Sequence, residues 1–222
     1  MSNTTDNITT AEIHLLSRKG FNRSKRVFDL FASFTLIILL FPVLILFPFI
    51  IYILTGKKPV YVDKRALTFK HKSFKLYKFR TFIKDPVASP LIKNDILSKP
   101  SHKELVFPFG KFLRKTGLDE LPQLFNILKG EMSFVGPRPL NFEDLRIMES
   151  DYPEIYERRS KIRSLPGLTG YWQIFGNREK GLNNLIELEE YYEKNKSFFF
   201  DMFVIFLSMP FVFFGKNSDA VV

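Results

Sequence analysis

The sequence contains no cysteine, and its three histidines are scattered at positions 14, 71 and 102. Without cysteine the chain has no disulfide framework, no thiolate-ligated zinc and no thiol nucleophile. Three isolated histidines also argue against a histidine-rich metal centre. The absence of cysteine is compatible with a reducing compartment.

Acidic residues are also in short supply relative to basic ones. The 222 residues include 33 Lys and Arg against 23 Asp and Glu, a formal net charge of +10, and the sequence pI is about 9.6. Such an excess points to a polyanionic partner: nucleic acid, an anionic membrane surface or a phosphorylated substrate. The length allows one ordinary domain with a sizeable core and an additional segment.

Charge is almost absent from Val27 to Leu54, where Asp29 is the one ionisable acid or base. At about 1.5 Å per residue, a straight helix over this segment would reach roughly 42 Å, beyond a hydrocarbon core of about 30 Å. The segment is too long for a secretory signal and no small-residue cleavage site follows it. It is also too apolar all round for a core helix of a small soluble domain. We therefore expect a membrane segment.

Basic residues flank this segment on both sides, with Arg23, Lys25 and Arg26 before it and Lys57 and Lys58 after it. The positive-inside rule places both flanks on the cytoplasmic side, which a hairpin permits and a straight span does not. Pro42, near the middle, lacks an N–H and breaks the helix, and Pro48 adds a second irregularity. These features predict a re-entrant helix–break–helix, with a kinked spanning helix as the alternative.

The remaining chain predicts an α+β, mainly helical fold. We expect a flexible tail over 1–20, the re-entrant membrane helix over 21–56, a small cytosolic catalytic domain over 57–197, an amphipathic membrane-interface helix over 198–214 and a tail over 215–222. Within the domain, alternating side chains predict strands or a hairpin over 59–83, and prolines predict a loop over 84–103. Helices are expected after Pro122, over 142–163 and over 183–196. The helix after Pro122 would present Leu121, Leu124, Phe125 and Leu128 on one face and end at Gly130.

Asp119 and Glu120 precede Pro122 at the start of that helix. Capping is the simpler explanation, because free N–H groups and the helix dipole favour carboxylates there. Neighbouring helical residues point about 100° apart, so the two acids would serve two roles, such as a nucleophile and a ligand for a divalent cation. A carboxylate nucleophile suits a phosphoryl group whose charge is neutralised by a cation and arginines.

Basic residues that suit phosphate surround the acids in the sequence. Arg138 stands between Pro137 and Pro139, which restrict its backbone, and a guanidinium binds phosphate oxygens in bidentate fashion. Further positive charge comes from Lys78 and Arg80 in YKFRT and from Arg114 and Lys115 just before the acids. Each alone fits an ordinary turn or a solvated basic patch equally well.

The combination resembles the bacterial sugar transferases, the monotopic phosphoglycosyl transferases, in their minimal short form. The resemblance runs from about Lys25 to Ser208 and rests on KRVFDL…FP, YKFRT, LRKTGLDELPQLFNILKGEMSFVGPRPL, PGLTG…Q and YYEKNKSFFFD, in the family's order. It implies a protein of the bacterial inner membrane, facing the cytoplasm, that moves a sugar 1-phosphate from a UDP-sugar to polyprenyl phosphate and so initiates surface glycan synthesis.

The resemblance also implies roles for individual residues. The aspartate matching Asp119 forms a covalent phosphosugar intermediate, and the glutamate matching Glu120 holds Mg²⁺. The proline matching Pro42 breaks the membrane helix. Residues matched to substrate binding are Lys78, Arg80, Arg114, Pro137, Arg138, Pro139, Gln173 and Arg178.

The chain departs from the family pattern around the segment that the resemblance implies shapes the nucleotide-sugar site. Tyr171 and Trp172 replace a Trp-Ala pair, and Asn177 stands where the family has arginine, with Arg178 one place later. A non-catalytic basic protein of the membrane surface, or an inactive relative kept as a scaffold, is therefore the alternative hypothesis. No motif resembles a nucleic-acid reader, so no nucleic-acid partner is expected. The sequence leaves the sugar and the oligomeric state open, with a homodimer as one option.

Overall fold

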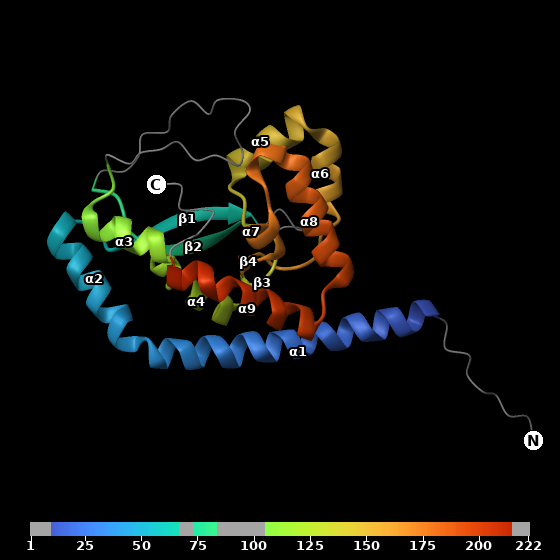
Figure 1. Ribbon diagram of the computed structural model, residues 1–222, viewed down its shortest axis with the longest axis horizontal. Helices are drawn as coiled ribbons and strands as arrows, with labels where there is room; N and C mark the ends of the chain where they lie inside the picture. The colour runs from blue at the N-terminus through green and yellow to red at the C-terminus, as the bar shows by residue number, and fades with distance from the viewer. Residues whose placement is uncertain (1–9, 67–72, 84–104, 215–222) are drawn as a thin grey trace, which may run out of the picture.

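The computed structural model describes residues 10–66, 73–83 and 105–214, which form a mainly helical α+β fold, as predicted (Figure 1). The expected loop over 84–103 and tail over 215–222 lie outside the described residues. The helices are α1 (Thr10–Leu39), α2 (Phe41–Thr55), α3 (Pro108–Thr116), α4 (Gln123–Lys129), α5 (Phe142–Asp151), α6 (Pro153–Ser160), α7 (Tyr171–Phe175), α8 (Gly181–Asn195) and α9 (Phe198–Phe214). The strands are β1 (Val60–Ala66), β2 (Ser73–Phe79), β3 (Ser133–Val135) and β4 (Gly167–Thr169), and the short 3₁₀ helices are η2 (Leu118–Glu120) and η3 (Arg178–Lys180).

The apolar segment is broken where the sequence predicts. Helices α1 and α2 meet at Leu40 with a bend of 62°, and Pro42 lies in the first turn of α2. Pro42 lacks an N–H and so cannot donate a hydrogen bond to the carbonyls at the end of α1. Pro48, in contrast, lies inside α2, which continues to Thr55. In the described residues no single helix meets the length and hydropathy of a membrane span, whereas this bent pair does so jointly.

Helix α1 begins at Thr10, so residues 10–20 of the predicted tail are helical, and residues 1–9 lie outside the described residues. Extending an existing helix costs far less than nucleating one, which explains why the polar segment continues the apolar helix.

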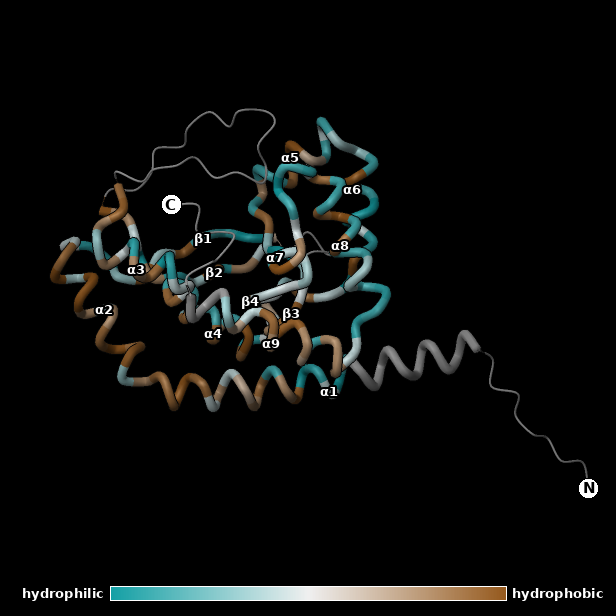
Figure 2. Tube along the Cα trace, in the orientation of Figure 1, coloured by the Kyte–Doolittle hydropathy of each residue, from teal (hydrophilic) through white to brown (hydrophobic). Residues whose placement is uncertain are grey.

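From Val27 onward the sequence of α1 is apolar all round, yet one face of the helix packs on the rest of the molecule. Phe28, Ala32 and Leu36 pack against the main core, and Asp29 and Ser33 are buried beside them. The opposite face exposes large hydrophobic side chains of the same helix, and Figure 2 shows that hydrophobic residues continue along α2. One face of α1 therefore packs against the domain, and the opposite face is an exposed apolar surface.

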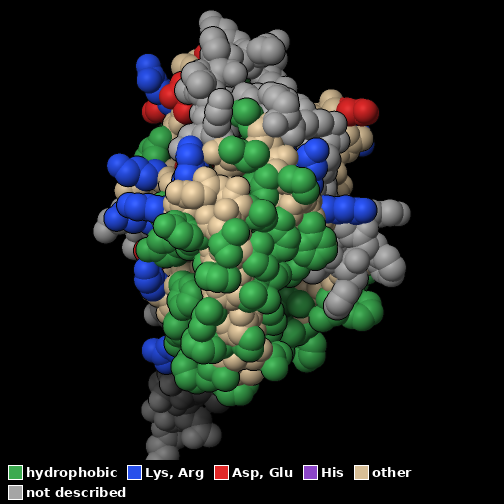
Figure 3. Space-filling model, turned by 90° about the vertical axis from the view of Figure 1, so that its left-hand side faces the viewer, with side chains coloured by type: hydrophobic (Ala, Val, Ile, Leu, Met, Phe, Trp, Pro, Cys, Tyr) green, Lys and Arg blue, Asp and Glu red, His purple; other side chains and the backbone are tan. Residues whose placement is uncertain are grey.

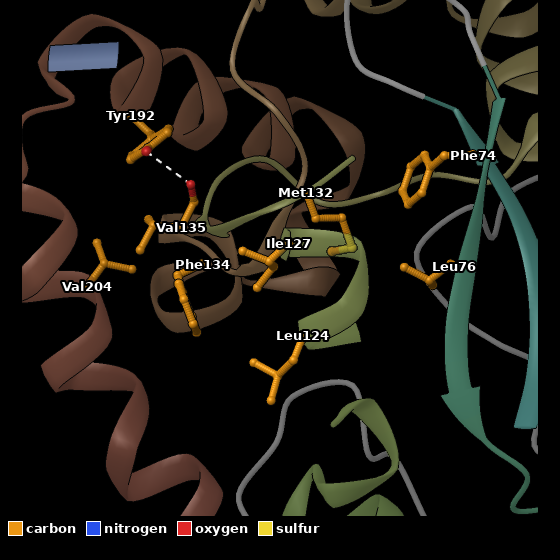
Figure 4. Close-up of a cluster of buried hydrophobic side chains, with 9 residues drawn as sticks. All are labelled: Phe74, Leu76, Leu124, Ile127, Met132, Phe134, Val135, Tyr192 and Val204. Carbon is orange, nitrogen blue, oxygen red and sulfur yellow. Dashed lines mark hydrogen bonds between the residues drawn. The ribbon is translucent and has the colours of Figure 1, made fainter. Parts of the chain in front are cut away.

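The main core surrounds α4 and β3 and draws on distant parts of the chain. Its buried members are Phe74, Leu76, Leu124, Ile127, Met132, Phe134, Val135, Tyr192 and Val204 (Figure 4). The Tyr192 hydroxyl donates to the carbonyl oxygen of Val135 at 3.2 Å, so α8 is held to β3. Burial of side chains this large contributes roughly 1.5–3 kcal/mol each before entropic costs.

Two small sheets complete the domain. Strands β1 and β2 form the antiparallel hairpin expected over 59–83, with Tyr61 opposite Lys78 and Arg65 opposite Phe74. Strands β3 and β4 pair in parallel, which joins residues 133–135 to residues 167–169.

A helical layer of α5, α6 and α8 lies beside the sheets (Figure 1). The helix predicted over 142–163 is two helices, because Pro153 begins α6 and Tyr152 departs from helical geometry between them. The helix expected over 198–214 is present as α9, and its Asp201 and Val204 face the interior.

Candidate active site

The acid pair lies in a tight turn between α3 and α4. Gly117 ends α3 with φ of 72°, a conformation that favours glycine, and Asp119 and Glu120 follow in η2. Pro122 occupies the N-cap position of α4. The prediction that the acids begin this helix is therefore corrected: they lie one turn before it, and neither holds its capping position. Both side chains are half-buried, so they remain accessible.

Lys78 of β2 pairs with this turn. Its Nζ donates to Glu120 Oε1 at 2.5 Å. Burial acts to lower the pKa of Lys78, but the carboxylates of Glu120 and Asp119 outweigh it and hold that pKa above its ordinary value. Lys78 is therefore an ammonium ion beside both carboxylates, as its predicted place in the site requires.

Arg65 of β1 was missed from the sequence and extends this charge cluster. Its guanidinium is paired with Asp63 at 2.6 Å, donates to the Pro139 carbonyl at 3.2 Å, and lies close enough to Lys78 to oppose its protonation. Lys78 and Arg65 share one face of the hairpin, because Tyr61 lies opposite Lys78 and the period of a strand is two. The alternation of side chains along β1 could have indicated Arg65 from the sequence, but only if the pairing of β1 with β2 had been known.

The loop containing Arg138 is fixed by the parallel sheet. The Gly136 N–H donates to Thr169 O at 3.0 Å, and the Gly167 N–H donates to Pro137 O at 2.9 Å. A Cβ on Gly136 would collide with the backbone of Leu165 and Gly167, so this close approach requires glycine. The motifs GPRP and PGLTG, distant in sequence, therefore form one corner of the site.

Asp144 of α5 links that corner to the hairpin. Burial raises the pKa of Asp144, while the positive charges of Arg65 and Arg138 oppose that rise. Arg65 therefore lies close to both Lys78, beside the acid pair, and Asp144, beside Arg138.

The other predicted basic residues lie on neighbouring elements. Arg80 donates from Nε to Lys58 O at 2.9 Å and lies over the ring of Tyr61, 5.9 Å from its centroid. Arg114, in the last turn of α3, lies over the ring of Phe82 at 5.1 Å. Arg114 therefore lies on the helix that leads into the acid-bearing turn, whereas Arg80 contacts Lys58 and Tyr61.

Gln173 and Arg178 belong to the segment after β4. Gln173 lies in α7, where its Oε1 is next to the space that a side chain on Gly170 would occupy, and Gly170 itself approaches Gly136. Gln173 is therefore part of the corner with GPRP. Arg178 lies in η3, which packs chiefly against α8.

The apolar face predicted for α4 is partly wrong. Phe125 is exposed, whereas Asn126 is fully buried. Asn126 Oδ1 accepts from the Tyr77 N–H at 3.1 Å, and its Nδ2 donates to Lys75 O at 2.6 Å. This amide fixes β2 against α4, next to Lys78. The predicted end of the helix at Gly130, with φ of 82°, is confirmed.

The residues present fit Mg²⁺ only together with a phosphorylated substrate. No cluster of three or more His, Cys, Asp or Glu side chains that could hold a metal occurs among the described residues. Magnesium commonly takes one or two carboxylates and completes its shell with water and substrate phosphates. Glu120, whose Oε1 is held by Lys78, suits such a single carboxylate ligand.

Comparison with known proteins matches a family model described as bacterial sugar transferase over residues 21–215. The chain is 33% identical over 205 residues to the exopolysaccharide production protein ExoY of Sinorhizobium fredii, covering 88% of each chain. It is 36% identical over 185 residues to the uncharacterized sugar transferase EpsL of Bacillus subtilis, covering 83% of this chain and 85% of that protein.

A longer relative carries a more specific name. The chain is 31% identical over 204 residues to the undecaprenyl-phosphate galactose phosphotransferase of Salmonella typhimurium, covering 86% of this chain and 40% of that protein. The site described above lies within the matched region of the family model.

Proposed function

The chain belongs to the bacterial sugar transferase family, and from this premise we propose that it moves a sugar 1-phosphate from a UDP-sugar to polyprenyl phosphate, such as undecaprenyl phosphate. The product would begin a surface glycan: capsule, exopolysaccharide, O-antigen or the glycan of a glycoprotein. The observation that carries the proposal is the Asp119–Glu120 turn, with Lys78 bonded to Glu120 and Arg65 close to Lys78.

The reaction would proceed in two displacements. A carboxylate oxygen of Asp119 attacks the sugar-linked phosphorus, the bond from that phosphorus to the bridging oxygen breaks, and its electron pair leaves with UMP. The sugar phosphate is then covalently bound to Asp119. In the second step an oxygen of polyprenyl phosphate attacks the same phosphorus and releases the carboxylate.

The basic residues make this attack feasible, because a carboxylate is otherwise repelled by a diphosphate. Lys78 keeps Glu120 in place and adds positive charge beside Asp119. Arg65 and Arg138 would bind phosphate oxygens through their guanidinium groups. Mg²⁺ held by Glu120 would supply further neutralisation of the phosphate charge.

The apolar surface supports a membrane location. Helix α2 exposes Ile45, Phe49 and Ile53, and Figure 3 shows hydrophobic side chains gathered on that side of the molecule with lysine and arginine at the edges. The outer face of α9 exposes Phe199 and Phe206, while its inner face joins the core. We place α1–α2 as a re-entrant pair entering from the cytoplasmic side of the inner membrane, with α9 at the interface.

The test is UMP release from a panel of UDP-sugars with Mg²⁺ and undecaprenyl phosphate. Asp119→Asn should abolish both UMP release and labelling of the protein by radioactive sugar phosphate, because the amide is not a nucleophile here. Asp151→Asn, an acid-to-amide change at an exposed position of α5, should leave both unchanged. Full activity in Asp119→Asn would refute the assigned nucleophile, and UDP binding without UMP release by the wild type would favour the inactive scaffold.

A further inference from the structure

A buried ion pair outside the acid-bearing turn is bonded to the backbone of Arg138. Glu189 of α8 and Arg159 of α6 are bonded to each other, with side chains only 1% and 4% exposed. Figure 1 shows α6 and α8 side by side, which brings the two residues together. Glu189 Oε1 accepts from the Arg138 N–H at 2.8 Å, and an Arg159 Nη2 donates to the Arg138 carbonyl at 2.6 Å.

These two contacts complete the hydrogen bonding of a short rigid loop. In Pro137-Arg138-Pro139 only Arg138 has a backbone N–H, since proline has none. The flanking carbonyls are held by other elements: Pro137 O accepts from Gly167 and Pro139 O from Arg65. The ion pair therefore binds both the N–H and the carbonyl of Arg138.

Stability is a poor explanation for this pair. Burying two charges costs several kcal/mol each, and apolar residues of similar size often serve as well or better. An apolar pair, however, could not hold the Arg138 peptide. We infer that Arg159 and Glu189 are positioning residues that fix the backbone of Arg138, so that its guanidinium meets the phosphates of the nucleotide sugar. The inference rests on the proposed phosphate-binding role of Arg138.

The same two helices offer a matched control in the neighbouring residues Arg158 and Glu190. Arg158 and Glu190 form a bidentate pair at 3.0 and 2.6 Å, with side chains 37% and 40% exposed. Among the described residues, the side-chain hydrogen bonds of Arg158 and Glu190 join these two residues to each other and not to Arg138. Each pair can be replaced by Met and Leu. Comparing the two variants then separates the effect of positioning Arg138 from the effect of weakening the contact between α6 and α8.

The experiment is a mutant cycle with Arg138→Ala. Arg159→Met with Glu189→Leu removes the bonds to Arg138 without leaving a lone buried charge. Its kcat/KM for the UDP-sugar should fall about tenfold to a hundredfold, the scale expected for a displacement of about 1 Å. Adding Arg138→Ala to this background should then cost less than about threefold, since residues acting through one another are non-additive. The control variant Arg158→Met with Glu190→Leu should keep normal kcat/KM and the full effect of Arg138→Ala.

An equal cost of Arg138→Ala in all backgrounds would overturn the inference. If the double variant unfolds on circular dichroism, Arg159→Lys provides the same cycle, because it retains the charge opposite Glu189 while losing the planar guanidinium that reaches two acceptors. A wild type that releases no UMP would refute the proposed function instead. In that case the cycle is run on UDP affinity by calorimetry, where the same non-additivity supports the inference and additive losses overturn it.

Discussion

Lys78 is the residue that ties the hairpin to the acid-bearing turn. Its ammonium contacts Glu120 and lies within the field of Asp119, while Arg65 on the same face of the hairpin opposes its charge. A positive group at this point offsets the repulsion between the two carboxylates and a diphosphate. The chemistry proposed for Asp119 therefore depends on a neighbour contributed by a strand about forty positions earlier in the chain.

We expect Lys78→Met to lower UMP release by about a hundredfold or more, because it removes charge that stabilises the developing phosphoryl transition state. Lys75→Met, an exposed position on the same strand, should have little effect. The measurement is the initial rate of UMP release at saturating Mg²⁺. Normal activity in Lys78→Met would show that the ion pair is not needed for the reaction.

The raised pKa of Lys78 also predicts a pH dependence. Its contribution to stability is fully present below the ordinary value of 10.5 and is lost only as pH rises through the higher folded pKa. The difference in melting temperature between wild type and Lys78→Met should therefore stay constant between about pH 7 and 10. A difference that vanishes within this range would contradict the ion pair.

At the scale of elements, α4 is held by polar side chains at its C-terminal end and at its middle. Arg26 of α1 donates to the carbonyls of Ile127 and Leu128 at 2.6 and 2.9 Å, which satisfies the C-terminal end of α4. Asn126 joins the same helix to β2 through Tyr77 and Lys75. The apolar helix, the acid-bearing turn and the hairpin are thus connected through α4.

Asn126→Ala should lower the free energy of unfolding by about 1–3 kcal/mol, because the Tyr77 N–H and the Lys75 carbonyl lose the partner that the buried Asn126 amide provides. The control is Asn195→Ala, an exposed position at the end of α8, where a change within about 0.5 kcal/mol is expected. Denaturant unfolding in detergent, followed by circular dichroism, measures both. Equal effects in the two variants would show that Asn126 does not hold β2.

For the whole molecule, the proposed topology is set by the bend between α1 and α2. Exposed large hydrophobic side chains cover the outer face of α1, much of α2 and the outer face of α9, while the opposite faces of α1 and α9 join one core. Extended exposed apolar surfaces mark sites of interaction with a partner or with a membrane. This surface fits a domain that rests on the membrane and inserts a bent helix pair.

The absence of native cysteine makes this topology directly testable. Single cysteines at the exposed positions Arg23 and Lys58 should react with an impermeant maleimide from the same, cytoplasmic side of inverted vesicles. A cysteine at Phe41, beside the bend, should react from neither side. Labelling of positions 23 and 58 from opposite sides would establish a spanning helix.

Local sequence signals determined much of this protein. Pro42 set the break, alternation set the hairpin, Gly130 set the end of α4, and the acid pair with its basic neighbours indicated phosphate chemistry. Each signal acts through the covalent geometry or charge of a few consecutive residues. A sequence can therefore be interpreted at these positions without knowing its long-range contacts.

Only the tertiary structure decided which distant residues meet. The register of β1 and β2 places Arg65 on the same face of the hairpin as Lys78. On α4 the buried residue is Asn126, and Phe125 is exposed. Which face of α1 packs inward is decided by the core against which it lies. The role inferred for Arg159 and Glu189 depends on the packing of α6 and α8 against the Arg138 peptide, which the sequence does not reveal. The physical reason is that burial and hydrogen bonding of a polar side chain depend on what packs against it, and that is a property of the whole fold.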